Sequence, residues 1–231
     1  MSNPPAAFVA GATGLTGRNV VAALRARGLT VYAHVRPDSS RIEHWQQHFG
    51  ALGAQVDTSA WTPAAMTATL RAHRPAVVFA LLGTTRKRMK AEGVDYEKVD
   101  LGLTTLLIDA CKAAEIPCRF VYLSSQGASP GTRSAYLAAR VAAEAHLRAS
   151  GLAFTIARPS IIQGERDEGR PGEHLGAVVG DGALALVRLF GGRGLADRFG
   201  SIDAGVLAEG LVRAGLDPAA AGQVVQGTAL R

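Results

Sequence analysis

The chain has 231 residues, of which 48% are hydrophobic and 19% charged, so it can bury a large core and is not expected to be disordered. Its net charge of +6 favours an anionic ligand, but the basic residues are mostly scattered, and no aromatic platform accompanies them, so nucleic-acid binding is not expected. Two cysteines without a CxxC motif exclude a disulfide framework and a thioredoxin-like redox motif, and indicate a reducing compartment.

The first half of the chain alternates short apolar runs with segments of helical spacing. Apolar runs and β-forming residues predict strands at 6–9, 30–35, 54–56 and 75–82. Helical spacing and helix-start signals predict helices at 15–27, 39–49 and 63–73. The longest apolar run, 76–82, is far too short to cross a membrane, and the first residues lack the pattern of a signal peptide. We therefore expect a cytoplasmic protein that does not bind membranes.

The second half continues the same alternation as far as Arg158. It predicts a long helix over about 92–114, a strand at 118–123, a helix at 134–150 and a strand at 153–157. The sequence then becomes polar and glycine-rich, which predicts a loop over 162–174, followed by helices at 175–190 and 206–214 and a last strand at 223–226. The basic run 86–90 is either a solvated loop or a rim that attracts a phosphorylated cofactor or an acidic substrate.

Continuous apolar strands that alternate with helices are typical of a parallel sheet covered on both faces. Right-handed crossovers then make the sheet doubly wound, so the sequence predicts an α/β fold of the Rossmann type. We expect one domain over 1–231, with a small substrate-side region at about 159–231.

A glycine-rich turn directly follows the first predicted strand and opens the first helix. It consists of Gly11, Ala12, Thr13, Gly14, Leu15, Thr16 and Gly17. Glycines at such a turn let the backbone approach a pyrophosphate closely, and the helix N-terminus offers N–H groups and a positive dipole end to the phosphates. The turn therefore predicts a dinucleotide-binding loop.

The end of the second strand bears on the choice between NADP(H) and NAD(H). Arg36 stands where an arginine would accept a ribose 2′-phosphate, with Arg41 and Arg18 as further cations. Asp38 is the argument against, because an acidic residue there would hold ribose hydroxyls instead. We favour NADP(H) and leave NAD(H) open.

Other strand ends supply further candidates. The cofactor of a Rossmann fold lies across the carboxyl ends of the strands, so Leu82, Gly83 and Thr84 are expected beside the nicotinamide-side ribose. Asp57 either contacts the adenine amino group or is an ordinary turn residue. His44 and His48 are spaced i, i+4 but have no third ligand nearby in the sequence, so no metal site is predicted.

The GxxGxxG spacing resembles the extended and atypical branches of the short-chain dehydrogenase/reductases. That resemblance implies a serine at the end of the fifth strand, which Ser125 matches, and a Tyr-x-x-x-Lys motif on the next helix, where this chain has Tyr136 and Arg140. In the family the tyrosine moves a proton, the serine binds the same substrate oxygen, and the lysine holds the nicotinamide ribose. Arginine keeps the charge but is bulkier and planar, which puts catalytic competence in question.

Five motifs in order narrow the resemblance: Leu82-Gly83-Thr84-Thr85-Arg86, Leu123-Ser124-Ser125-Gln126-Gly127-Ala128, Arg158-Pro159-Ser160, Gly164-Glu165-Arg166 and Arg170-Pro171-Gly172-Glu173. Together they are similar to the Tat-interacting-protein family of atypical short-chain dehydrogenases, which is akin to the nitrogen-metabolite-repression-regulator type of NADP-binding proteins. The resemblance implies NADPH binding and a cofactor contact at Pro159. Arg140 departs from the lysine that this family usually keeps.

Two functions follow as hypotheses. The first is an NADP(H)-dependent oxidoreductase that acts on a small carbonyl or alcohol through Ser125, Tyr136 and Arg140. The second is a protein that senses NADP(H) or supports protein partners with little turnover. The sequence leaves open the substrate and whether the chain forms a homodimer or binds another protein.

Overall fold

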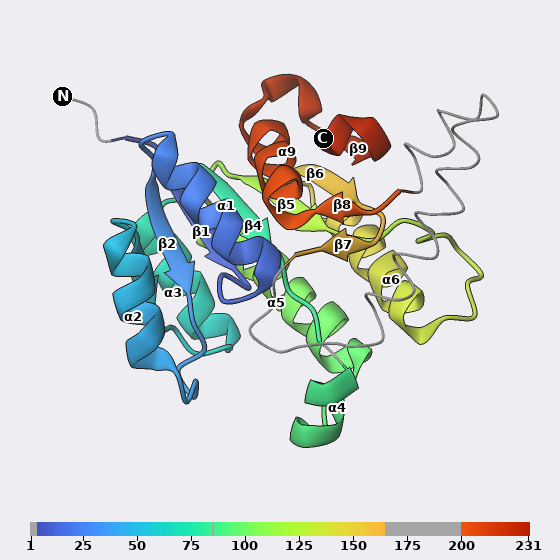
Figure 1. Ribbon diagram of the computed structural model, residues 1–231, viewed down its shortest axis with the longest axis horizontal. Helices are drawn as coiled ribbons and strands as arrows, with labels where there is room; N and C mark the ends of the chain where they lie inside the picture. Colours follow the sequence, from blue (N-terminus) through green and yellow to red (C-terminus); the bar gives the residue numbers. More distant parts are fainter. Residues whose placement is uncertain (1–3, 85, 165–199) are drawn as a thin grey trace.

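A seven-stranded parallel sheet forms the centre of the computed structural model, which describes residues 4–84, 86–164 and 200–231 (Figure 1). The strand order across the sheet is β3-β2-β1-β4-β5-β6-β9. The strands are β1 (Ala6–Ala10), β2 (Thr30–His34), β3 (Gln55–Asp57), β4 (Val77–Ala80), β5 (Arg119–Leu123), β6 (Ala153–Arg158) and β9 (Gln223–Gln226). The chain reverses its direction of travel across the sheet between β3 and β4, so the carboxyl ends of β1 and β4 flank the switch point at which Rossmann folds bind ligands.

Helices cover both faces of the sheet. One face carries α1 (Leu15–Ala26), α2 (Ile42–Ala51) and α9 (Ala204–Leu216), and the other carries α3 (Pro63–His73), α5 (Leu103–Ala114) and α6 (Ala135–Ala149). Alternate strand residues point into the two cores: Phe79 and Val121 lie in the first, and Phe8 and Tyr122 in the second. The predicted doubly wound α/β fold is confirmed, because strands that are buried on both faces need helices on both.

The predicted long helix over about 92–114 is confirmed from Glu97 to Ala114, but its start is wrong. The chain instead forms α4 (Arg86–Glu92), then a π-helical turn, η1 (Glu97–Gly102), which leads into α5. Gly93 adopts a left-handed conformation, with φ of +62°, and ends α4. The basic run 86–90 therefore belongs to a short helix and not to a loop.

The C-terminal part contributes mostly to the main sheet and its helical layer. The predicted helix at 206–214 is α9, which packs against α1, and the predicted strand at 223–226 is β9, which pairs with β6. Two short strands that the sequence did not predict, β7 (Ile162–Gln163) and β8 (Ile202–Asp203), pair beside α9. Two 3-10 helices, η2 (Pro218–Ala220) and η3 (Gly227–Leu230), flank β9.

Some expectations fall outside the described residues. These are the predicted helix at 175–190, the Arg-Pro-Gly-Glu motif at 170–173 and residues 165–199 of the proposed substrate-side region. In the described parts of the chain, none of the helices is both long and apolar enough to cross a membrane.

Candidate functional site

The glycine-rich loop after β1 can only be built with glycine at two positions. Gly11 has a φ of +82°, and a Cβ there would lie 2.5 Å from the carbonyl oxygen of Leu81. A Cβ on Gly17 would lie 2.1 Å from the carbonyl oxygen of Gly11. The loop is therefore held tightly between the end of β4 and the first turn of α1, with Ala12 and Thr16 buried beneath it.

Gly14 is different, because it lines the pocket beside the loop and its conformation does not require glycine. It is the N-cap of α1, its φ of −73° suits any residue, and a Cβ there would approach only the Gly11 carbonyl oxygen, at 3.3 Å. No side chain caps the helix at this end, so the first turn of α1 presents its backbone N–H groups. Such a helix N-terminus suits a phosphate, so the loop fits the pyrophosphate of a dinucleotide.

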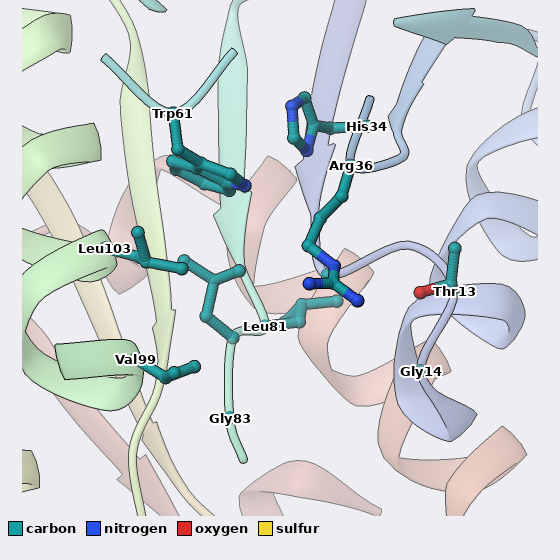
Figure 2. Close-up of a pocket in the computed structure, with 11 residues that line it drawn as sticks. Thr13, Gly14, His34, Arg36, Trp61, Leu81, Gly83, Val99 and Leu103 are labelled. Carbon is teal, nitrogen blue, oxygen red and sulfur yellow. The ribbon is translucent and has the colours of Figure 1, made fainter. Parts of the chain in front are cut away.

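A pocket opens beside this loop at the carboxyl ends of β1, β2 and β4 (Figure 2). Its wall also includes residues that follow β3 and residues from η1 and the start of α5. The lining residues are Gly11, Thr13, Gly14, His34, Arg36, Trp61, Leu81, Leu82, Gly83, Val99 and Leu103. Six of them belong to the predicted cofactor residues, so the structure brings the glycine loop, Arg36 and the end of β4 to one cavity.

One end of the pocket is aromatic, which sequence reasoning missed. Figure 2 shows His34 and Trp61 facing each other there, and their ring centroids lie 4.8 Å apart in an edge-to-face arrangement. The His34 Nε2–H donates to the carbonyl oxygen of Ser59 at 2.8 Å, and burial lowers the pKa of His34, so the ring is neutral at pH 7. An uncharged aromatic wall has the chemistry to take a flat base. The only sequence signal was the position of His34 at the end of β2.

Arg36 reaches across the pocket, with its guanidinium beside Leu81 and toward the turn at Thr13 and Gly14 (Figure 2). Its Nη1 lies 3.4 Å from Oε2 of Glu92 and 3.5 Å from Oδ2 of Asp38. Asp38 is thus an ion-pair partner of Arg36 in this structure.

The other two predicted cations lie away from the lining of this pocket. The guanidinium carbon of Arg41 is 5.0 Å from the ring centroid of Trp45, and that of Arg18 is 6.0 Å from it. Both guanidinium groups therefore lie over the ring of Trp45 on α2, whose electron-rich face attracts a positive charge.

Asp57, at the end of β3, is part of a hydrogen-bonded cluster between β3 and α3. Its carboxylate accepts from the Thr69 hydroxyl at 2.7 Å, from the Ser59 backbone N–H at 3.0 Å and from His73 at 3.0 Å. Burial alone would raise the pKa of Asp57, but these hydrogen bonds outweigh it and lower that pKa. The geometry matches the turn interpretation more closely than a contact with adenine.

Arg140 is buried, and all four N–H bonds of its terminal nitrogens point at protein oxygens. Nη1 donates to the Leu123 carbonyl at 2.9 Å and the Tyr122 hydroxyl at 3.3 Å. Nη2 donates to the Leu82 carbonyl at 3.1 Å and to Oδ1 of Asp100 at 2.7 Å. Arg140 therefore ties the carboxyl ends of β4 and β5 to α6, and these nitrogens have no N–H left for a ribose.

Asp100 is the partner that the sequence did not reveal. It is fully buried in the π-helical turn η1, and its second carboxylate oxygen accepts from the Thr84 backbone N–H at 2.9 Å. A Cβ on Gly83 would lie 3.0 Å from Nη2 of Arg140, so glycine admits the guanidinium here. Within the described residues, Thr84 Oγ1 and Arg140 Nε are buried without a hydrogen-bond partner.

Tyr136 lies on the outer side of this cluster. The guanidinium carbon of Arg140 is 5.1 Å from its ring centroid, and Tyr96 packs edge-on against it at 5.3 Å. The Ser125 hydroxyl donates to the Gln126 carbonyl at 3.3 Å, and the Gln126 N–H donates to the Pro159 carbonyl at 2.9 Å. The loops after β5 and β6, which carry Ser125 and Pro159, are therefore linked to each other.

A second buried charge, Glu144, lies at the carboxyl ends of β5 and β6. Glu144 on α6 accepts from the Ser124 hydroxyl at 2.6 Å and from Arg158 at 2.8 and 2.6 Å, with Arg148 at 3.0 Å. Burial alone would raise the pKa of Glu144, but hydrogen bonds from Arg158, Ser124 and Arg148 lower it. No sequence pattern points to this role of Glu144, because only the fold brings β5, β6 and α6 together.

Comparison with known families finds one matching family model and several curated relatives. A family model described as NAD(P)H-binding matches residues 11–181. "Protein fmp52, mitochondrial" of Aspergillus clavatus is 34% identical over 167 residues, which is 69% of this chain and 64% of the relative. "Protein fmp52-1, mitochondrial" of Aspergillus terreus is 29% identical over 220 residues, 89% of this chain and 85% of the relative. The names of these relatives place them in mitochondria, whereas cytoplasmic location stays a prediction for this chain.

Solved structures with the same fold include sugar-nucleotide epimerases. UDP-N-acetylglucosamine 4-epimerase from Bacillus cereus superposes with a TM-score of 0.65 at 17% identity, covering 97% of this chain and 78% of that one. The Bordetella bronchiseptica enzyme WbmH in complex with NAD+ gives 0.63 at 18%, covering 91% and 72%. AtPrR2 with NADP+ and (+)pinoresinol gives 0.67 at 17%, covering 97% and 70%. At these identities the likeness shows the fold, which agrees with the short-chain dehydrogenase resemblance.

Proposed function

Because the chain belongs to the NAD(P)H-binding family, we propose that it binds NADP(H) in preference to NAD(H) and acts as an oxidoreductase on a small carbonyl or alcohol. The observation that carries the proposal is a single pocket that joins the uncapped N-terminus of α1 to the Arg36 guanidinium. In this proposal the glycine loop holds the pyrophosphate, the 2′-phosphate meets Arg36, and the base lies toward His34 and Trp61.

The oxidoreductase assignment depends on residues at the ends of β4 and β5. A bound nicotinamide supplies or accepts a hydride, and the protein must then move a proton at the substrate oxygen. We assign that proton to the Tyr136 hydroxyl and the orientation of the oxygen to Ser125. The positive charge of Arg140, beside the Tyr136 ring, favours negative charge that develops on the phenol oxygen. Arg140 itself then acts as a positioning residue, while Leu82, Gly83, Thr84 and Pro159 would border the nicotinamide side.

One observation favours a second candidate function, an NADP(H) sensor or partner-binding protein with little turnover. The cation that the resembled enzymes use to hold the ribose is replaced here by a guanidinium whose terminal nitrogens are all bonded to protein oxygens. Without that contact the nicotinamide ring is held less firmly for reaction, although the pyrophosphate and 2′-phosphate contacts remain.

The cofactor preference is tested by titrating the parent and Arg36→Ala with NADPH and with NADH in a calorimeter. Loss of a charge-assisted hydrogen bond to the 2′-phosphate should weaken NADPH by about 1.5–3 kcal/mol and leave NADH nearly unchanged. Arg41→Ala is the matched control, because that arginine stacks on Trp45 and should alter neither affinity strongly. Equal losses for both cofactors would show that Arg36 does not read the phosphate.

Turnover separates the two candidate functions. A panel of small carbonyls is followed with NADPH by the absorbance of the reduced ring, for the parent and for Tyr136→Phe. The oxidoreductase assignment expects Tyr136→Phe to lose turnover and to keep its NADPH affinity, since only the hydroxyl is removed. If Tyr136→Phe is as fast as the parent, the assignment of the proton is wrong. A parent that binds NADPH tightly and reduces none of the panel supports the sensor.

A further inference from the structure

Two carboxylates lie beside one nitrogen, Nη1, of the guanidinium that the proposed function assigns to the 2′-phosphate. Arg36 follows β2, whereas Glu92 ends α4, 56 residues further along the chain, and the fold brings their charged groups to 3.4 Å. A carboxylate and a phosphate bind a guanidinium through the same N–H groups. Glu92 is therefore placed where it competes with a phosphate for Arg36.

Competition of this kind acts on only one of the two cofactors. A 2′-phosphate needs the Arg36 N–H groups, so its apparent affinity falls by the fraction of molecules in which Glu92 holds them. The corresponding group of NAD(H) is a neutral hydroxyl, which has no comparable attraction to the guanidinium. Glu92 thus lowers the preference for NADP(H) and leaves the affinity for NAD(H) unchanged.

Asp38 approaches the same nitrogen but differs from Glu92 in two respects. Its side chain is 73% exposed, compared with 36% for Glu92, so solvent screens its charge more strongly. It also lies two residues from Arg36 on the same loop, whereas Glu92 comes from a separate helix. The two carboxylates therefore form a natural matched pair for an experiment.

We propose that Glu92 is a specificity-determining residue that competes with the 2′-phosphate for Arg36. The inference rests on the proposed NADP(H) binding and deepens it, because it names a group that sets the difference in affinity between NADP(H) and NAD(H). The same contact connects α4 to the cofactor pocket. When a 2′-phosphate binds Arg36, the ion pair between Glu92 at the end of α4 and Arg36 after β2 is broken.

The test compares the parent, Glu92→Gln and Asp38→Asn by calorimetric titration with NADPH and with NADH at low ionic strength. Each substitution removes one negative charge and keeps the shape of the side chain. Glu92→Gln should raise the NADPH affinity about threefold, the size expected for loss of one partly exposed ion pair, and leave the NADH affinity unchanged. Asp38→Asn should raise it less, and added salt should reduce both effects.

Three outcomes would overturn the inference: an NADPH affinity of Glu92→Gln no higher than that of the parent, an equal gain for NADH, or an equal gain in Asp38→Asn. The last two would assign the effect to net charge and not to Glu92. Failure of the proposed cofactor site looks different, because the parent and both variants would then bind neither NADPH nor NADH. The inference would then fall with that site.

Discussion

Arg140 stands where the resembled family keeps a lysine, and the structure shows what the change of side chain does. A guanidinium can hold four oxygens in a plane at once, which a single ammonium cannot. Here those oxygens come from the segment after β4, from β5 and from η1, so one side chain links three parts of the chain at the proposed nicotinamide side. Burial alone would lower the pKa of Arg140, but Tyr122, Tyr136 and Asp100 raise it above its usual range, so the group is a permanent cation.

Arg140→Lys is therefore expected to destabilise the protein, although it restores the family's residue type. The ammonium can keep Asp100, but it leaves one or both of the Leu82 and Leu123 carbonyls without a donor, at a cost of about 1–3 kcal/mol in the free energy of unfolding. Urea denaturation measures this. The control is Arg148→Lys, the same change on the same helix at a half-exposed side chain, which should cost about 0.5 kcal/mol or less. Equal stability of Arg140→Lys and the parent would show that the hydrogen bonds of Arg140 to these carbonyls do not stabilise the fold.

At the scale of the element, the loop between β1 and α1 separates two uses of glycine. Gly11 and Gly17 are required by the fold, because a Cβ at either would enter backbone atoms. Gly14 is not, because its conformation suits other residues and its nearest neighbour is 3.3 Å away. In the same motif, Gly11 and Gly17 are needed for the loop to fold, whereas the missing side chain of Gly14 leaves space beside the loop.

Substitutions in this loop should separate folding from binding. Gly14→Val is expected to fold with a melting temperature moderately below the parent's, because its Cβ would lie 3.3 Å from the Gly11 carbonyl oxygen. It should lose dinucleotide binding, because its side chain fills the space for the pyrophosphate. Gly17→Ala is expected to unfold or to melt well below the parent, since its Cβ would lie 2.1 Å from a carbonyl oxygen. Thermal melts and NADPH titration measure the two effects, with Gly50→Ala on the open surface of α2 as control. Unchanged NADPH affinity in a folded Gly14→Val protein would remove the pyrophosphate assignment.

At the scale of the whole molecule, acid should first destabilise the fold through His34. Burial lowers the pKa of His34, so the folded protein keeps the ring neutral while the unfolded chain takes up a proton at about pH 6.5. This contribution to stability is complete above about pH 6.5 and declines as the pH falls through that value toward the lower folded pKa. The glutamine of His34→Gln can still donate to the Ser59 carbonyl but does not titrate. This variant should therefore not lose stability between about pH 6.5 and the lower folded pKa of His34.

Two carboxylates add a second stage at lower pH. The folded pKa values of Asp57 and Glu144 lie below their unfolded values, so the stability they provide is complete above about pH 4 and is lost as the pH falls through the folded values. Melting temperatures measured from about pH 8 to about pH 2 should show both declines in the parent. A melting temperature that does not change below about pH 6.5 would contradict both assignments.

The sequence by itself determined the layered fold and the glycine-rich turn between β1 and α1, because both depend on local patterns. Apolar runs such as 75–82 must be buried on both faces, and the spacing of the glycines directly after the first strand marks a tight turn that opens a helix. The tertiary structure decided what no local pattern carries: that Asp100, 40 residues from Arg140, is its partner, that Glu92 lies against Arg36, and that His34 and Trp61 form one wall. Polar pairs of this kind form between elements far apart in the chain, and their charges become neighbours only after the sheet has placed the strand ends together.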